Sequence, residues 1–309
     1  MGVFRNALLW GSENQWMRKN VPSFGFVKRA VKRFMPGEQI HDAIEVTKHF
    51  NNLGIPATFT HLGENLSDIS EARGVADHYL EVLELIKNKN IDAEISVKLT
   101  QLGFDQSAEL THKYLTEIAS KAKEYNNTVF IDMEGSAYTE ITIEFYKRVK
   151  EQFPNVGLCL QAYLYRTEND LKSLLPYKPL IRLVKGAYNE PPDIAMERKK
   201  EVDENYYNLS LMLLDAVKEG NARAAFATHD ELLIERIRNY GTSIGIPQDK
   251  IEFQMLYGIK PAFQRKLATE GVKILVLISY GDAWFPWYMR RLAERPANVG
   301  FVIKNMFAK

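Results

Sequence analysis

Short apolar runs alternate along the chain with longer segments whose apolar residues recur at the period of a helix. The runs are rich in β-branched and aromatic residues, as expected for buried strands. They lie at Ala57–Thr60, Glu94–Leu99, Thr128–Met133, Gly157–Gln161, Leu180–Val184, Arg223–Ala227, Ile251–Met255 and Val272–Ile278. The helix-period segments lie at Ile69–Lys87, Leu110–Glu124, Thr139–Gln152, Ala195–Lys218, Asp230–Tyr240 and Lys260–Thr269.

Strands that alternate with helices form βαβ units and a parallel sheet. Eight such runs in a chain of 309 residues predict an α/β fold, a (β/α)8 barrel of the TIM type. A doubly wound open sheet is the alternative. No low-complexity segment or linker divides the chain, so we expect an N-terminal helical arm at residues 1–50 and one catalytic barrel at residues 51–309.

The first forty residues differ from the rest because basic and apolar side chains are interleaved there. The basic residues are Arg5, Arg18, Lys19, Lys28, Arg29, Lys32 and Arg33, and the apolar ones among them are Phe24, Phe26, Val27, Val31 and Phe34. Two interpretations stay open. The segment is either an amphipathic surface helix that meets anionic lipid or a helical arm packed on the barrel with its basic residues in water.

Composition limits the binding partners and the cellular compartment that we expect for the protein. The formal net charge of +1 provides no overall field for nucleic acid, so we expect no nucleic-acid partner. Cys159 is the only cysteine, which excludes an intrachain disulfide and a multi-cysteine zinc site. The sequence has no apolar run of about 18 residues and no signal-peptide pattern. We expect a cytoplasmic protein. Peripheral contact of residues 1–40 with the inner face of the plasma membrane is compatible with that location.

Charged residues interrupt three of the predicted strands near their carboxyl ends. Lys98, Asp132 and Arg182 each lie in or directly after an apolar run. Strands buried on both faces are otherwise nearly continuous in apolar residues, so such charges are costly unless they are paired or bound to a ligand. Because active sites of α/β barrels lie at the carboxyl ends of the strands, these residues are candidates for a site. A buried structural ion pair between Lys98 and Asp132 is the simpler alternative.

The remaining polar residues at the strand ends favour a ligand with phosphate or an electron-rich ring. Gly186 permits close backbone approach, Gln161 offers both a donor and an acceptor, and Arg182 and Lys185 are cationic. This set suits a flavin. It also suits a phosphorylated sugar, with Lys98 or Lys185 as a Schiff-base lysine. The histidine spacing argues against a metal site, and no hydrolase elbow or phosphate-binding P-loop motif is present.

The stretch from Tyr280 to Pro296 predicts a C-terminal helix. Asp282 is placed to cap that helix, and Pro286 is tolerated near its first turn. The helix then carries Arg290 and Arg291 side by side. Two adjacent guanidiniums after an aromatic face form a carboxylate clamp, or else they are a solvated basic end favoured by the helix dipole.

Taken together, these segments resemble the proline dehydrogenase family of flavoenzymes, in its monofunctional bacterial form. The resemblance covers about residues 55 to 305 and rests on several motifs in order. They are Ile95–Leu99, Ile131–Glu134, Leu160–Tyr163, Arg182–Tyr188, Ala227–His229, Phe253–Gly258 and Arg290–Pro296.

The resemblance implies a (β/α)8 barrel that binds FAD, oxidises L-proline to Δ1-pyrroline-5-carboxylate and passes electrons to a quinone. It implies that the flavin is lined by Met133, Gln161, Lys185, Gly186, Ala187, Thr228 and His229. By the same resemblance Arg182 lies near flavin N5, and Lys98, Arg290 and Arg291 hold the substrate carboxylate. Asp132 would order the cationic cluster, and Tyr188 would help to close the pocket.

The sequence departs from the family pattern on the wall that faces the substrate ring. Leu277 and Trp287 stand where the family usually has two tyrosines that pack on the ring, and Gly135 replaces a common second acid. Two alternatives to proline oxidation follow within the flavin class: another cyclic secondary amine such as 4-hydroxyproline, or a flavin-binding relative with little turnover. A Schiff-base lyase on the same barrel is a third alternative.

Overall fold

Eight parallel strands close into a barrel in sequential order in the computed structural model, which describes residues 10–11, 14–21, 24–63, 66 and 68–294. Each strand pairs with its sequence neighbours, and β8 pairs with β1 to close the ring. The strands are β1 (Ala57–His61), β2 (Ala93–Val97), β3 (Val129–Ile131), β4 (Val156–Gln161), β5 (Leu180–Val184), β6 (Arg223–Ala227), β7 (Glu252–Leu256) and β8 (Lys273–Tyr280). The expected barrel is therefore confirmed and the doubly wound sheet is excluded.

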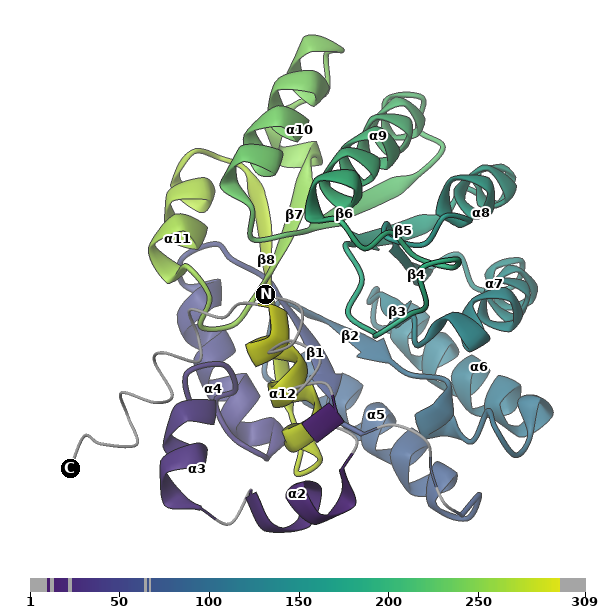
Figure 1. The fold of residues 1–309 in the computed structure, drawn as a ribbon, viewed down its shortest axis with the longest axis vertical. Helices are drawn as coiled ribbons and strands as arrows, with labels where there is room; N and C mark the ends of the chain where they lie inside the picture. Colours follow the sequence, from purple (N-terminus) through teal and green to yellow (C-terminus); the bar gives the residue numbers. More distant parts are fainter. Residues whose placement is uncertain (1–9, 12–13, 22–23, 64–65, 67, 295–309) are drawn as a thin grey trace.

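Helices surround the barrel, as Figure 1 shows. They are α2 (Gln15–Asn20), α3 (Gly25–Val31), α4 (Ile40–Asn51), α5 (Glu71–Asn88), α6 (Ala108–Glu124), α7 (Ser136–Lys150), α8 (Thr167–Leu174), α9 (Lys199–Lys218), α10 (Glu231–Ser243), α11 (Pro261–Thr269) and α12 (Trp284–Glu294), with short 3-10 turns η2 (Thr100–Leu102), η3 (Leu175–Tyr177) and η4 (Gln248–Lys250). Residues of the expected arm and barrel at 1–9 and 295–309 lie outside the described residues.

Local sequence explains where these helices form. In α5 the buried residues Ala72, Ala76, Tyr79, Leu83 and Ile86 follow one another at intervals of three or four, which gives one apolar face toward the barrel. The α10 helix begins at an Asp230 cap whose carboxylate accepts from a backbone N–H of the first turn. The C-terminal helix begins at Trp284, two residues beyond the expected Asp282 cap.

The inner face of the barrel is polar and carries charge. Thr60 contacts Asp132 across the barrel, and Ser279 is the register partner of Thr60 on β8. Because side chains alternate between the two faces of a strand, Leu277 lies on the same inner face as Ser279. The outer face contributes Phe59, Ile278 and their neighbours to the apolar layer beneath the helices.

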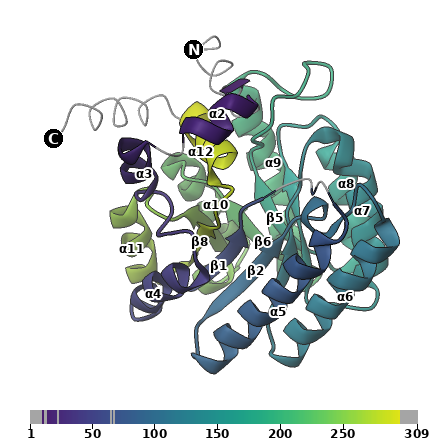
Figure 2. The same ribbon diagram turned by 90° about the horizontal axis from the view of Figure 1, so that it is seen from below.

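The N-terminal helices pack on α12 beside the barrel, where Figure 2 shows α2 and α12 together. Val27, Val31 and Phe34 are buried in a cluster with Trp284, Tyr288 and other residues of α12. The Trp284 indole N–H also donates to Glu38 at 3.0 Å. The packed-arm interpretation therefore holds for these residues, whereas the side chains of Phe26 and Lys28 lie outside the described set.

Aromatic residues on the other side of the arm remain exposed. Trp10, Trp16 and Phe24 are exposed to solvent, as are Arg18 and Lys19 at the end of α2. Among the helices that the structure describes, none combines the length and apolar character needed to cross a membrane.

The turn after β7 contacts the N-terminal arm closely, and this contact leads to a testable prediction. Gly258 has a φ of +75°, and a Cβ there would lie 1.6 Å from the Arg33 carbonyl oxygen. We expect Gly258→Ala to displace the arm and to lower stability beyond the ~1–2 kcal/mol that a left-handed alanine costs. Thermal unfolding and limited proteolysis of the arm measure both effects.

Gly245→Ala is the matched control, because Gly245 has a φ of +87° and open space around the added Cβ. Equal losses of stability in the two variants, with no added cleavage in the arm, would contradict the packing of the arm on this turn.

Candidate active site

Three charged side chains that the sequence singled out meet inside the barrel. Asp132 follows β3, and its carboxylate lies 3.4 Å from the Lys98 ammonium and 3.0 Å from the Arg182 guanidinium. Arg182 is 1% exposed and Lys98 is 8% exposed. The structure therefore brings together one carboxylate and two cations, which leaves a net positive charge just inside the strand ends.

The charge state of Asp132 follows from these neighbours. Burial by itself raises the pKa of the carboxyl, but the positive charges of Lys98 and Arg182 outweigh it, with help from a Ser96 hydroxyl that donates at 2.6 Å. The Asp132 pKa consequently lies below its ordinary value. The carboxylate stays ionised at neutral pH and neutralises one of the two cations.

Arg182 is held from several sides. Its Nη1 donates to the Ser96 hydroxyl at 2.8 Å and to Asp132, and its Nε donates to the Gln254 side-chain oxygen at 2.7 Å. The guanidinium lies 4.3 Å from the centroid of the Phe130 ring. Its Nη2 is buried and makes no hydrogen bond in the part of the chain that the structure describes. The hydrogen-bonding capacity of that nitrogen is therefore not used by any described residue.

Gln161 at the end of β4 presents an acceptor. Its amide nitrogen donates to the backbone oxygens of Met133 at 3.2 Å and Glu134 at 3.0 Å, so the orientation of the amide is fixed. The side-chain oxygen is buried and has no partner among the described residues. Unsatisfied buried oxygens are uncommon, so this one points to a missing N–H or O–H donor.

The backbone after β5 approaches its surroundings closely. Gly186 has a φ of +121°, and a Cβ there would lie 2.2 Å from the Tyr163 ring. A side chain at this position is excluded by both conformation and space. Ala187 follows it with a small side chain, so the loop after β5 leaves its backbone accessible at the barrel mouth.

Lys185 and the end of β6 form a second polar group. The Lys185 ammonium lies 2.5 Å from Asp203 and 3.4 Å from Asp230. The Thr228 hydroxyl accepts from the backbone N–H of Asp230 at 3.2 Å, and His229 Nε2 accepts from the backbone N–H of Leu256 at 2.9 Å. These contacts fix the ends of β5, β6 and β7 relative to one another.

The C-terminal helix brings the two arginines to the side of the barrel mouth that follows β8. The Arg290 guanidinium lies 5.4 Å from the Tyr188 ring, and that of Arg291 lies 6.0 Å from the Trp287 ring on the same helix. Trp287 is 8% exposed and belongs to the cluster between α12 and the arm. The arm thus fixes the helix that carries Arg290 and Arg291.

A histidine pair lies at the end of β1. The ring of His61 stacks on that of His78 at 4.7 Å, and His78 Nε2 lies 2.8 Å from the Tyr280 hydroxyl oxygen. Burial and the proximity of His78 lower the pKa of His61 to about 4. His61 is therefore neutral at physiological pH and is a weak base.

Sequence reasoning missed Ser96, Gln254 and Phe130, which hold Arg182. A signal was present, because Ser96 and Gln254 are polar residues inside apolar runs, just as Arg182 is. Glu134 was also unassigned, and it accepts from the Thr100 backbone N–H and hydroxyl at 3.2 and 2.7 Å. The residues Glu64 and Asn65 after β1, and Arg295 and Pro296 of the last motif, lie outside the described residues.

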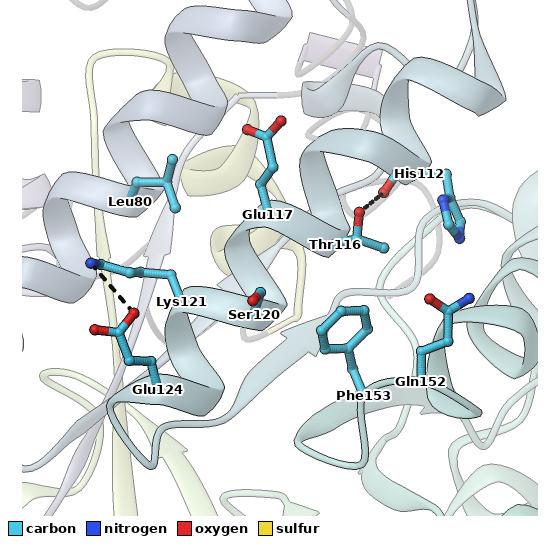
Figure 3. A pocket seen from close by; sticks show the side chains of 9 residues that line it. All are labelled: Leu80, His112, Thr116, Glu117, Ser120, Lys121, Glu124, Gln152 and Phe153. Carbon is cyan, nitrogen blue, oxygen red and sulfur yellow. Dashed lines mark hydrogen bonds and ion pairs between the residues drawn. The ribbon is translucent and has the colours of Figure 1, made fainter.

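A separate hollow lies on the outer wall of the barrel (Figure 3). Its lining comes from α5, α6 and the turn after α7 and includes Leu80, His112 and Phe153. None of its lining residues belongs to a strand, so this hollow is distinct from the charged group inside the barrel.

Comparison with known proteins agrees with this geometry. A family model described as proline dehydrogenase matches residues 43–304. Proline dehydrogenase 1 of Bacillus subtilis subsp. natto is 39% identical over 99% of this chain and 100% of its own length. Proline dehydrogenase of Deinococcus radiodurans is 36% identical over 89% of each chain.

Solved structures support the fold. Proline utilization A from Bdellovibrio bacteriovorus, inactivated by N-propargylglycine, superposes with a TM-score of 0.82 at 24% identity. This chain is covered to 99% in that match and spans 37% of the longer protein. Since the family model covers most of the chain and the relatives align end to end, the chain belongs to the proline dehydrogenase family.

Proposed function

We propose that this protein is an FAD-dependent dehydrogenase that oxidises L-proline to Δ1-pyrroline-5-carboxylate. The observation that carries the proposal is the buried group of Lys98, Asp132 and Arg182, with its net positive charge and an Arg182 nitrogen that has no hydrogen-bond partner among the described residues. Relatives named proline dehydrogenase align along the whole chain. A positive group inside the barrel suits a reaction that moves a hydride, and with it negative charge, onto a cofactor.

The strand ends have the donor set that a flavin requires. The unpartnered Gln161 oxygen fits the imide N–H of the ring, and the unpartnered Arg182 nitrogen fits the N5 edge. The Tyr163 ring fills the space that a side chain at Gly186 would take, and the half-buried backbone of Gly186 and Ala187 is the proposed contact for the cofactor at the end of β5. Met133, Lys185, Thr228 and His229 complete the proposed lining.

Contact between Lys185 and the cofactor depends on the ion pairs that Lys185 already makes. Its ammonium is engaged by Asp203 and Asp230, so contact with the cofactor requires that it share or exchange these partners. A lysine on a flexible stem is suited to such an exchange.

We assign the substrate carboxylate to Lys98, Arg290 and Arg291. Guanidiniums bind carboxylates through two parallel hydrogen bonds, which orients the substrate as well as holding it. Tyr188, stacked against Arg290, covers the clamp. Asp132 holds Lys98 and Arg182 near each other, because its carboxylate lies between them and offsets part of their mutual repulsion.

Bound FAD supplies the acceptor for the hydride that leaves the ring carbon next to nitrogen. The chain's own residues orient the substrate, and the buried Arg182 guanidinium would stabilise the negative charge that the hydride brings to the acceptor. The cations around the carboxylate lower the proton affinity of the substrate amine, which must be neutral to lose a hydride. We assign the loss of that proton to exchange with solvent before the hydride leaves.

Oxidation of a different cyclic amine is the second candidate, and Leu277 favours it. This residue lies on the inner face, where the family pattern has a tyrosine, and it offers neither a ring nor a hydroxyl. A substrate with a substituted ring, such as 4-hydroxyproline, gains room there. Trp287 does not restore the wall fully, because it is buried in the cluster with the arm.

We further propose that a quinone accepts the electrons and that the arm brings the protein to an anionic membrane. The support is the exposure of Trp10, Trp16 and Phe24 among exposed basic residues. Amphipathic segments with aromatic and basic residues bind the interface of anionic bilayers. Arg18 and Lys19 supply the charge at the end of α2.

The absorption spectrum tests the main proposal. We expect a yellow protein whose flavin band bleaches when L-proline is added without oxygen. Arg290→Met should retain the band but need about tenfold or more proline for the same bleaching, since a charge-assisted pair contributes ~1.5–3 kcal/mol. A protein that stays colourless with added FAD would exclude a flavin enzyme and favour a lyase that uses a Schiff-base lysine.

Replacement of Asp132 tests the charge balance. Asp132→Asn leaves two cations without their carboxylate and should lower the free energy of unfolding by ~3–5 kcal/mol. Because the Asp132 pKa is lowered in the fold, its contribution exists at neutral pH and disappears as the pH falls through that lowered pKa. The difference between variant and wild type should therefore shrink in acid.

Urea unfolding across a pH series measures this difference. The exposed Asp215, which accepts from Tyr240, provides the control variant Asp215→Asn, for which we expect a change within ~0.5 kcal/mol. A pH-independent difference for Asp132→Asn would show that folding does not lower the pKa of this carboxyl.

Substitution at position 277 separates the two substrates. Leu277→Tyr should raise kcat/KM for proline and lower it for trans-4-hydroxyproline, with a change of ~1–2 kcal/mol in their ratio. Leu232→Tyr, on the exposed surface of α10, is the control. An unchanged ratio would mean that Leu277 does not face the substrate.

Vesicle sedimentation tests the membrane proposal. We expect binding to vesicles that contain phosphatidylglycerol, weakened by salt, and little binding to phosphatidylcholine alone. Joint replacement of Trp16 and Phe24 by alanine should reduce binding about tenfold or more. Ile141→Ala, at another exposed apolar residue, is the control. Equal binding to both kinds of vesicle would refute an electrostatic contact.

A further inference from the structure

A line of hydrogen bonds leads from Arg182 through the Gln254 side-chain amide to Glu252, toward the opposite end of the barrel. The Gln254 side-chain oxygen accepts from Arg182 Nε at 2.7 Å, and the Gln254 amide nitrogen donates to Glu252 at 2.9 Å. Gln254 is 1% exposed and Glu252 is 2% exposed. Both side chains therefore depend on each other for their hydrogen bonds.

Glu252 fixes the direction in which this amide points. An ionised carboxylate only accepts hydrogen bonds, so the Gln254 nitrogen must face Glu252 and the oxygen must face Arg182. Glu252 is held in turn by Arg223 at 2.9 Å and by Lys273 at 2.8 Å. These cations outweigh the effect of burial and lower the Glu252 pKa, which keeps the carboxylate ionised.

An aromatic ring lies between the two charged layers. The Phe130 ring centroid is 4.3 Å from the Arg182 guanidinium and 5.7 Å from that of Arg223. Phe130 thereby fixes the spacing of the two guanidiniums, while Gln254 provides the hydrogen-bonded link. Contacts to Ser96, Asp132 and Gln254 use Nη1 and Nε, and they leave Nη2 for a ligand.

We propose, on the basis of the function proposed above, that Gln254 is a positioning residue for Arg182. Its amide holds the guanidinium plane so that Nη2 is presented to the flavin, and it does so without adding negative charge. Lys98 and Arg182 against Asp132 leave one net positive charge, which a carboxylate at position 254 would cancel. Orientation and charge are thus separable at this position.

Two substitutions at position 254 test the orientation of Arg182 and the net charge of the site separately. Gln254→Met keeps the size and the net charge but removes the acceptor, so flavin reduction by proline should slow about tenfold while KM changes less than about twofold. Gln254→Glu keeps an acceptor but cancels the charge, so the flavin midpoint potential should become more negative and KM for proline should rise. That shift should disappear in acid, where the introduced carboxyl is protonated.

Gln264 provides a matched control. It is a fully buried glutamine whose amide donates to the backbone oxygens of Leu256 at 3.0 Å and Ile259 at 2.9 Å, on the outer side of the barrel. Gln264→Met should lose stability as Gln254→Met does, but it should keep the wild-type potential and reduction rate.

Rapid-mixing reduction and spectroelectrochemistry on the FAD-loaded protein decide the matter. The proposal is overturned if Gln254→Met slows reduction no more than Gln264→Met, or if Gln254→Glu has the wild-type potential at neutral pH. If Gln254→Met does not fold, Gln254→Glu in acid is decisive, because its protonated carboxyl still accepts from Arg182 and donates to Glu252: a reduction rate that stays below that of wild type at the same acid pH overturns the proposal. A wild-type flavin that proline does not bleach would refute the proposed substrate, and the Gln254→Glu potential would still test the role of Gln254.

Discussion

A positive charge buried in the middle of the barrel is the constraint on which the rest of the interior depends. Arg182 is 1% exposed, and an unpaired guanidinium at that depth would cost several kcal/mol. Its partners come from β2, β7 and the end of β3, so the charge is stable only when the barrel is closed. Closure of the barrel brings the partners of Arg182 together, and their hydrogen bonds in turn stabilise the closed barrel.

The strands were predictable because their signal is local, whereas the contacts of Arg182 were not. Runs of apolar residues mark strands buried on both faces, and each predicted run overlaps an observed strand, although the boundaries differ by a few residues. The helix α8 was not expected, since only four of its residues are buried and its first turn is acidic. Ser96 and Gln254 lie far apart in sequence, and only the barrel topology brings them to one guanidinium.

The N-terminal arm shows a different limit of sequence patterns. Its periodicity identifies which residues share a face, but it does not identify what covers that face. Val27, Val31 and Phe34 lie against α12, whereas Trp16 and Phe24 on the same segment remain exposed. Packing on α12 accounts for one face of the arm, and the aromatic residues on the other face are exposed to solvent. Because α12 carries Arg290 and Arg291, packing of the arm also determines where these arginines lie.

Charge and shape have separate tasks in a site of this kind. In the proposed function the cations act on a carboxylate and on developing negative charge, and neither feature distinguishes one cyclic amino acid from another. Discrimination among rings depends on apolar walls, where a change of one methylene or ring contact amounts to ~1–3 kcal/mol. Lys98, Asp132 and Arg182 match the family pattern, while Leu277 departs from it on the inner face of the same barrel. We expect a substitution at Leu277 to change ring preference without disturbing the buried charges, because the hydrogen bonds of Arg182 and Asp132 run to Ser96, Gln254 and Lys98 and not to this wall.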